Sequence, residues 1–214
     1  MADTRSSRIS RRLVVAAGLA TLPGAALAAR GPVVTMLGDS ITAGYGLQQK
    51  DSLPIQLQAE LTRRGVAAYV RGAGVSGDTT AGGAARADFS IRPDTAVVVV
   101  ALGGNDLLQG IDPKSSYANL DRILTRLKER HMGVVLAGLQ APPELGKGYA
   151  QAFDAIFPEL AKKHGVVLYP NLLAGVARNP ALNQGDAIHP NAKGVKIIAA
   201  RLAPVVAKAL TGRS

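Results

Sequence analysis

Thr95-Ala96-Val97-Val98-Val99-Val100-Ala101-Leu102 places four consecutive valines inside an apolar run that has no polar alternation. A strand with one solvated face alternates apolar and polar side chains, so this run predicts a strand that is buried on both faces. Helices cover both faces of a sheet when they connect parallel strands. The run therefore predicts a parallel sheet between two helical layers.

The sequence on either side of this run repeats the same alternation of apolar β-branched runs and helical patterns. The expected strands cover residues 33–37, 66–70, 95–102, 134–139 and 166–169. The expected helices cover residues 53–64, 79–87, 115–131, 149–164 and 192–210, and Pro204 should kink the last one. Crossovers between parallel strands are right-handed, and ligands bind at the carboxyl ends of such strands.

Chemistry-bearing residues follow the first three expected strands: Ser40, Gly77 and Asn105. They should therefore meet at one rim of the sheet. Ser40 lies in Gly38-Asp39-Ser40-Ile41, Asn105 in Gly103-Gly104-Asn105-Asp106, and a third motif, Asp186-Ala187-Ile188-His189-Pro190, comes late in the chain. A hydroxyl, an amide, a base and an orienting carboxylate are the groups that acyl transfer to water needs. The chain has no Gly-x-Ser-x-Gly, the nucleophile motif of α/β-hydrolases.

Ser40 and His189 are the expected nucleophile and base. Ser40 alone could be a helix N-cap, but the other motifs favour a nucleophile. His131 and His164 each precede a helix-ending glycine and are interpreted as structural helix-end cations. His189 has no such role, and Pro190, expected at the first position of the last helix, holds it on a stiff loop. Asp186 can accept the Nδ1 proton of His189 and leave Nε2 facing the serine.

The expected oxyanion donors are the backbone N–H groups of Ser40 and Gly77 and the side-chain amide of Asn105. Asn105 could instead be a turn residue that bonds only its own backbone. Asp78 is expected to cap the helix that follows it.

Asp39 and Asp106 are expected to hold loop geometry. Asp39, Asp106, Asp186 and His189 could also be interpreted as ligands of a hard cation or zinc. The Asp-x-x-His pair has no second histidine and the chain has no cysteine, so neither a metal nor another cofactor is expected.

Residues 1–28 have the pattern of a secretion signal: arginines, then an apolar segment too short for a good membrane span, then Ala26-Leu27-Ala28. Arg11-Arg12 also resembles a twin-arginine signal. Residues 29–214 would be the mature domain, which is expected in the periplasm or secreted, with no stable membrane anchor. Removing four arginines and one aspartate lowers the net charge from +10 to +7. The basic residues are scattered, so nucleic acid is not an expected partner.

These motifs resemble the SGNH, or GDSL, hydrolase superfamily, whose four letters match Ser40, Gly77, Asn105 and His189. Longer matches, at 38–46, 76–80 and 149–158, resemble the bacterial periplasmic subfamily of multifunctional thioesterases, lysophospholipases and arylesterases. The resemblance covers roughly residues 32–210. It implies a flavodoxin-like three-layer α/β/α sandwich with strand order 2-1-3-4-5.

The resemblance also implies an acyl-enzyme mechanism on a small-molecule ester or thioester. A monomer is favoured, and residues 109–115 and 140–148 would set specificity. Two other functions stay open from the sequence. One is a carbohydrate O-deacetylase on the same scaffold, which the few aromatic residues disfavour. The other is a non-catalytic periplasmic binding protein, which the intact set of four residues disfavours.

Overall fold

The computed structural model describes residues 1 and 31–212. The described chain contains one parallel sheet with the order β2-β1-β3-β4-β5. Its strands are β1 (Val33–Gly38), β2 (Tyr69–Gly74), β3 (Thr95–Ala101), β4 (Gly133–Ala137) and β5 (Val167–Tyr169). The predicted α/β class and strand order are confirmed.

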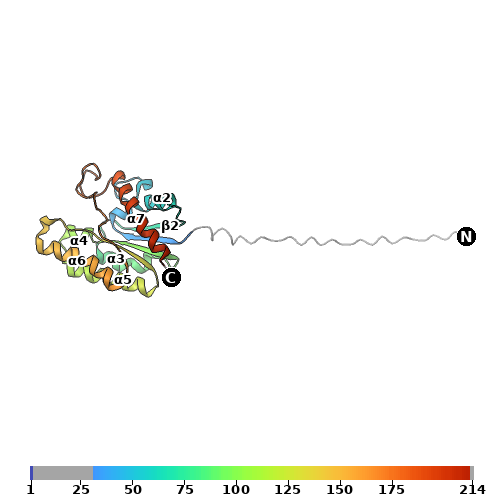
Figure 1. Ribbon diagram of the computed structural model, residues 1–214, viewed down its shortest axis with the longest axis horizontal. Helices are drawn as coiled ribbons and strands as arrows, with labels where there is room; N and C mark the ends of the chain where they lie inside the picture. The colour runs from blue at the N-terminus through green and yellow to red at the C-terminus, as the bar shows by residue number, and fades with distance from the viewer. Residues whose placement is uncertain (2–30, 213–214) are drawn as a thin grey trace.

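Helices cover both faces of the sheet (Figure 1). Their bounds are α1 (Ser40–Ala43), α2 (Leu53–Arg63), α3 (Thr80–Ser90), α4 (Gly104–Gln109), α5 (Pro113–Glu129), α6 (Lys147–His164) and α7 (Ala192–Thr211), with short 3₁₀ turns at Gln49–Asp51 and Pro143–Leu145. α2 packs with α7 on one face, and α3, α5 and α6 pack side by side on the other. Within the described residues, no helix is both long and apolar enough to cross a membrane.

The centre of the core is β3, as the valine run predicts. Val97 to Val100 are fully buried, and Phe153 and Phe157 of α6 pack edge to face beneath the helical layer. Each buried side chain of this size contributes roughly 1.5–3 kcal/mol of transfer free energy. The apolar core thus lies directly below the rim that carries the polar motifs.

The second strand begins later than predicted, at Tyr69 and not at Val66. The N–H of Val66 donates to the carbonyl of Leu61, after Gly65 in a left-handed conformation, so Val66 closes the end of α2. β2 begins at Tyr69, which pairs with Val33, the first residue of β1. The neighbouring strand, rather than the local apolar pattern, sets where this strand starts.

α7 starts at Ala192, as predicted, but Pro190 is not its first residue. Asn191, not a first-turn proline, is the N-cap, and its side-chain oxygen accepts from the N–H groups of Lys193 and Gly194 at 3.0 and 3.1 Å. Pro190 lies one residue earlier, in an isolated bridge with Asn183. α7 continues through Pro204 to Thr211. The predicted signal segment lies outside the described residues, apart from Met1.

Candidate active site

Ser40 lies at the first position of α1, directly after β1 ends. Asp39 is the N-cap of this short helix, and its Oδ1 accepts from the N–H of Ile41 at 3.0 Å. The capping role that Ser40 could have had therefore belongs to Asp39, and the Ser40 hydroxyl is available for another contact. Gly44, in the left-handed conformation, ends α1 after one turn.

The Ser40 hydroxyl contacts a ring that comes from the other end of the described chain. Ser40 Oγ lies 2.8 Å from His189 Nε2, although 149 residues separate the two in sequence. His189 Nδ1 lies 2.6 Å from Asp186 Oδ2. The structure thus brings together the three residues that the sequence singles out as nucleophile, base and orienting carboxylate.

The charge of Asp186 fixes the direction of these two hydrogen bonds. Hydrogen bonds from the backbone N–H and ring of His189, and from the N–H of Ile188, lower the pKa of Asp186 to about 2. An ionised carboxylate can only accept, so His189 Nδ1 carries the proton. In the neutral ring, Nε2 then accepts from the Ser40 O–H, which is the orientation that proton abstraction requires.

A glutamine that sequence reasoning missed ties the serine loop to the histidine loop. Gln184 Nε2 donates to the carbonyl of Tyr45 at 2.8 Å and to that of Pro190 at 3.1 Å, and the Gln184 N–H donates to the carbonyl of His189. A Cβ at Gly46 would overlap Gln184 Oε1, so glycine there makes room for this side chain. The Tyr45 ring lies 4.7 Å from the His189 ring, centroid to centroid.

Gly77 lies on the same rim, in a tight turn after β2. The N–H of Asp78 donates to the carbonyl of Val75 at 3.1 Å, and Gly77 has a φ of +85° at the third position of that turn. This left-handed conformation is what a type II turn requires and is why glycine stands there. No described atom lies within 4 Å of where a Gly77 Cβ would be, so the space beside it is open.

Asn105 lies in the first turn of α4, a helix that sequence reasoning missed. Its Nδ2 donates to the carbonyl of Asp78 at 2.8 Å, across 27 residues of sequence. The contact is therefore long-range and not the local turn bond that was the alternative. An amide nitrogen has two hydrogens, so this bond orients the side chain and leaves its second N–H for another acceptor.

Asp78 does not cap α3, contrary to the prediction. Thr79 is the cap, and its Oγ1 accepts from the N–H of Gly82. Asp78 Oδ2 instead lies 2.6 Å from Nε of Arg86, a residue that sequence reasoning did not single out.

Asp106 and Asp39 hold loop geometry, as predicted. Asp106 is fully buried, and its carboxylate accepts from the N–H and hydroxyl of Thr80 and from the hydroxyl of Ser116. Burial raises the pKa of Asp39 to about 6, against the opposing effects of the Ile41 N–H and the nearby His189. The shift places an unusually basic carboxylate directly before Ser40.

The remaining histidines lie away from this site. His164 ends α6, and its Nε2 lies 2.6 Å from Asp121 of α5, so it ties two helices together. His131 follows α5 in a left-handed conformation. Nowhere in residues 31–212 do three or more His, Cys, Asp or Glu side chains gather closely enough to hold a metal ion.

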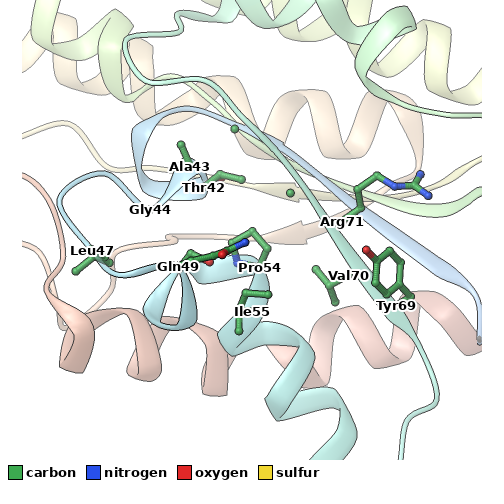
Figure 2. A pocket seen from close by; sticks show the side chains of 13 residues that line it. Thr42, Ala43, Gly44, Leu47, Gln49, Pro54, Ile55, Tyr69, Val70 and Arg71 are labelled. Carbon is green, nitrogen blue, oxygen red and sulfur yellow. The ribbon is translucent and has the colours of Figure 1, made fainter.

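The larger cavities flank β2, the edge strand, rather than the Ser40–His189 contact. One, of about 560 Å³, lies between α1, α2 and β2, and Figure 2 shows Pro54, Ile55, Val70 and Arg71 around it. The other, of about 660 Å³, lies on the α3 side of the same strand. Ser40 and His189 together line a much smaller cavity. Neither of the two larger cavities is lined by Ser40 or His189.

Comparison with known proteins identifies relatives across most of the chain. Residues 36–197 match the model of the GDSL-like lipase/acylhydrolase family. An arylesterase of Vibrio mimicus is 34% identical over 176 residues, which cover 82% of this chain and 88% of the relative. Thioesterase 1/protease 1/lysophospholipase L1 of Escherichia coli (strain K12) is 34% identical over 173 residues, 80% of this chain and 82% of that protein.

A solved structure agrees with these matches. AlinE4, described as an SGNH-hydrolase family esterase, is 44% identical to the chain, with a TM-score of 0.70. The alignment covers 83% of this chain and 96% of AlinE4. Sequence and fold thus point to the same group of enzymes.

Proposed function

Because the chain belongs to the GDSL-like lipase/acylhydrolase family and is a carboxylic ester hydrolase, we propose that Ser40, His189 and Asp186 are its catalytic triad. The observation that carries this proposal is the 2.8 Å contact between Ser40 Oγ and His189 Nε2, made by two residues 149 apart in sequence. A structural role does not require a serine, a histidine and an ionised aspartate in this order. Acyl transfer to water by a serine nucleophile uses these three groups in this order.

In the proposed reaction, His189 Nε2 takes the Ser40 proton as Oγ attacks the carbonyl carbon of an ester or thioester. Asp186 stabilises the imidazolium that forms and keeps the ring oriented. The tetrahedral intermediate collapses when His189 protonates the leaving alcohol or thiol. His189 then activates a water molecule, which attacks the acyl-enzyme, releases the carboxylic acid and restores the Ser40 hydroxyl.

We further propose that the oxyanion is held by the N–H groups of Ser40 and Gly77 and by the second N–H of Asn105. The left-handed conformation of Gly77 and the open space beside it support this role. The bond from Asn105 to the Asp78 carbonyl supports it too, because an amide that is already oriented loses no freedom when charge develops.

The proposed substrates are aryl esters and esters or thioesters of short to medium acyl chains, including acyl-CoA and lysophospholipids. The names of the relatives, an arylesterase and a thioesterase/lysophospholipase, support this range. A chain-length series of p-nitrophenyl esters, beside acyl-CoA, lysophospholipid and an acetylated oligosaccharide, tests it. Preference for the oligosaccharide would instead support the O-deacetylase alternative.

Ser40→Ala is expected to lower kcat on p-nitrophenyl acetate by at least about a hundredfold while leaving the thermal unfolding midpoint in place, since the nucleophile is lost. A serine-directed phosphonate should label the wild-type protein once, at Ser40. Ser76→Ala is the matched control, because Ser76 is an exposed serine in the turn after β2, whereas it is Ser40 whose Oγ contacts His189. Normal turnover by Ser40→Ala, or labelling of another serine, would overturn the assignment.

We also propose that the protein is exported and that its mature form begins at Ala29. The arginine-rich start and the Ala26-Leu27-Ala28 site support this. N-terminal sequencing of active protein from the periplasm or medium is the test, and a retained Met1 or Ala2 would contradict it. Arg11→Lys with Arg12→Lys should block export only if the twin-arginine route is used.

A further inference from the structure

Arg86, on the inner side of α3, joins two of the three segments that carry the proposed oxyanion donors, the end of β1 and the segment from β2 to Asp78. Its Nη2 donates to the carbonyl of Gly38, two residues before Ser40, at 2.8 Å. Its Nη1 donates to the carbonyl of Ala73, near the end of β2, at 2.8 Å, and to the hydroxyl of Ser90. Its Nε donates to Asp78 at 2.6 Å. One planar group therefore fixes the ends of β1 and β2 and the turn that follows.

Asp78 passes this constraint on to the rim. Its carboxylate is bound by Arg86, its N–H closes the turn that holds Gly77, and its carbonyl accepts from Asn105 Nδ2. The side chains of Arg86 and Asp78 are only 19% and 14% exposed, so water competes weakly for their hydrogen bond. A shift of the Asp78 backbone would move both its carbonyl, which orients the Asn105 amide, and its N–H, which closes the turn around Gly77.

We propose that Arg86 is a positioning residue that sets the geometry of the oxyanion hole through Asp78. The inference rests on the proposed roles of Gly77 and Asn105. Arg86 does not touch the reacting atoms itself. Its fork of donors reaches the carbonyls and the carboxylate at once, which the single ammonium of a lysine cannot do.

Substitution of Gly82 offers a second way to test the position of Asp78. A Cβ at this position would overlap Asp78 Oδ1, so glycine in the first turn of α3 leaves room for the carboxylate. Gly82→Ala should displace Asp78 while favouring the helix, because alanine has the higher helix propensity. Loss of activity without loss of stability in this variant would separate positioning from a purely structural role.

The matched control is Arg71, which is also 19% exposed and is held by a carboxylate. Its Nη1 and Nη2 donate to Asp94 at 2.8 Å each, away from the rim. Arg71→Lys therefore makes the same chemical change as Arg86→Lys in a pair that does not contact Asp78.

The test measures kcat and KM for p-nitrophenyl acetate per active site, titrated with a phosphonate so that unfolded protein is not counted. Arg86→Lys should lower kcat by about 10- to 100-fold, the range for a weakened oxyanion donor, with KM within about twofold. Gly82→Ala should also lower kcat, at an unchanged or raised unfolding midpoint. Arg71→Lys should change kcat by less than about twofold.

A double-mutant cycle shows whether the effect passes through the oxyanion hole. In an Asn105→Ala background, Arg86→Lys should cost at least about threefold less in kcat than in the wild type. A trifluoromethyl ketone forms a tetrahedral adduct on the nucleophile. The affinity of Arg86→Lys for this inhibitor should fall by the same factor as its kcat/KM.

The proposal would be overturned if the effects of Arg86→Lys and Asn105→Ala on kcat simply multiplied in the double mutant. A normal kcat per titrated site in both Arg86→Lys and Gly82→Ala would overturn it as well. Failure of the triad is distinguishable, because it would show as activity in Ser40→Ala, whatever Arg86 does.

Discussion

Asp39 and Asp186 both lie beside the Ser40–His189 contact, yet their surroundings shift their pKa values in opposite directions. Asp186 is exposed and accepts three hydrogen bonds, which lower its pKa to about 2. Asp39 is buried, and burial raises its pKa to about 6. The Asp186 carboxylate is therefore charged throughout the neutral pH range, whereas the Asp39 carboxylate changes charge near pH 6.

Asp39→Asn should stabilise the protein in a pH-dependent way. Because the folded pKa of Asp39 lies above the ordinary value of 3.8, the folded state retains a proton that the unfolded state loses between about pH 4 and 6. The contribution of Asp39 to the free energy of unfolding of the wild type therefore falls across this pH window and stays lower above it. Asparagine can still accept from the N–H of Ile41, so the variant should equal the wild type near pH 4 and exceed it by roughly 1–3 kcal/mol at pH 8.

Urea unfolding at pH 4, 6 and 8 measures this difference. Asp112→Asn, which changes the exposed cap of α5 in the same way, is the control. A gap between Asp39→Asn and the wild type that does not widen with pH would contradict the raised pKa.

Asp186→Asn should lower kcat by at least about a hundredfold with little change in KM. The asparagine oxygen can still accept the N–H groups of Ile188 and His189, so its amide nitrogen would face His189 Nδ1. The ring would then carry its proton on Nε2, where it cannot accept from Ser40. Steady-state kinetics of Asp186→Asn beside His189→Ala checks this, and His189→Ala should lose more. A near-normal kcat in His189→Ala would mean that another group acts as the base, and a near-normal kcat in Asp186→Asn would mean that Asp186 is not needed to orient the ring.

At the scale of elements, the site is built from the segments that follow strands and from one loop before a helix. β1, β2 and β3 end at one rim and deliver Ser40, Gly77 and Asn105 there. The loop that carries Asp186 and His189 is held at its far end by the start of α7. The cap of α7 therefore affects both the stability of a helix and the position of the base.

Asn191→Ala should lower the free energy of unfolding by about 1–2 kcal/mol. The side chain caps two N–H groups of α7, and its Nδ2 also donates to the carbonyls of Ala181 and Asn183. Asn191→Asp keeps the cap and loses the Nδ2 donors, so it should cost less. Urea denaturation of the three proteins gives the order, and an alanine variant as stable as the wild type would exclude this role for the cap.

For the whole molecule, the valine run and its flanking alternation were enough to predict a parallel sheet with helices on both faces. The predicted contacts of Ser40, Asp186 and His189 are present. The convergence of strand ends accounts for the position of Ser40, whereas Asp186 and His189 lie in the loop before α7 and were predicted from their own motif. Arg86 and Gln184 could not be predicted in the same way. Each acts through backbone carbonyls of distant segments, and a carbonyl has no signature in the sequence. The same holds for Asp78, whose ion pair with Arg86 prevailed over its local tendency to cap.

The contact between Ser40 and His189 joins the first strand of the described chain to its last loop. During synthesis, the serine leaves the ribosome about 150 residues before the histidine that it contacts in the folded protein. The contact cannot form until the loop that carries His189 has been made, and the helix after that loop, α7, packs against α2 and the sheet. The nascent chain therefore cannot form the proposed catalytic pair before it has been synthesised as far as His189.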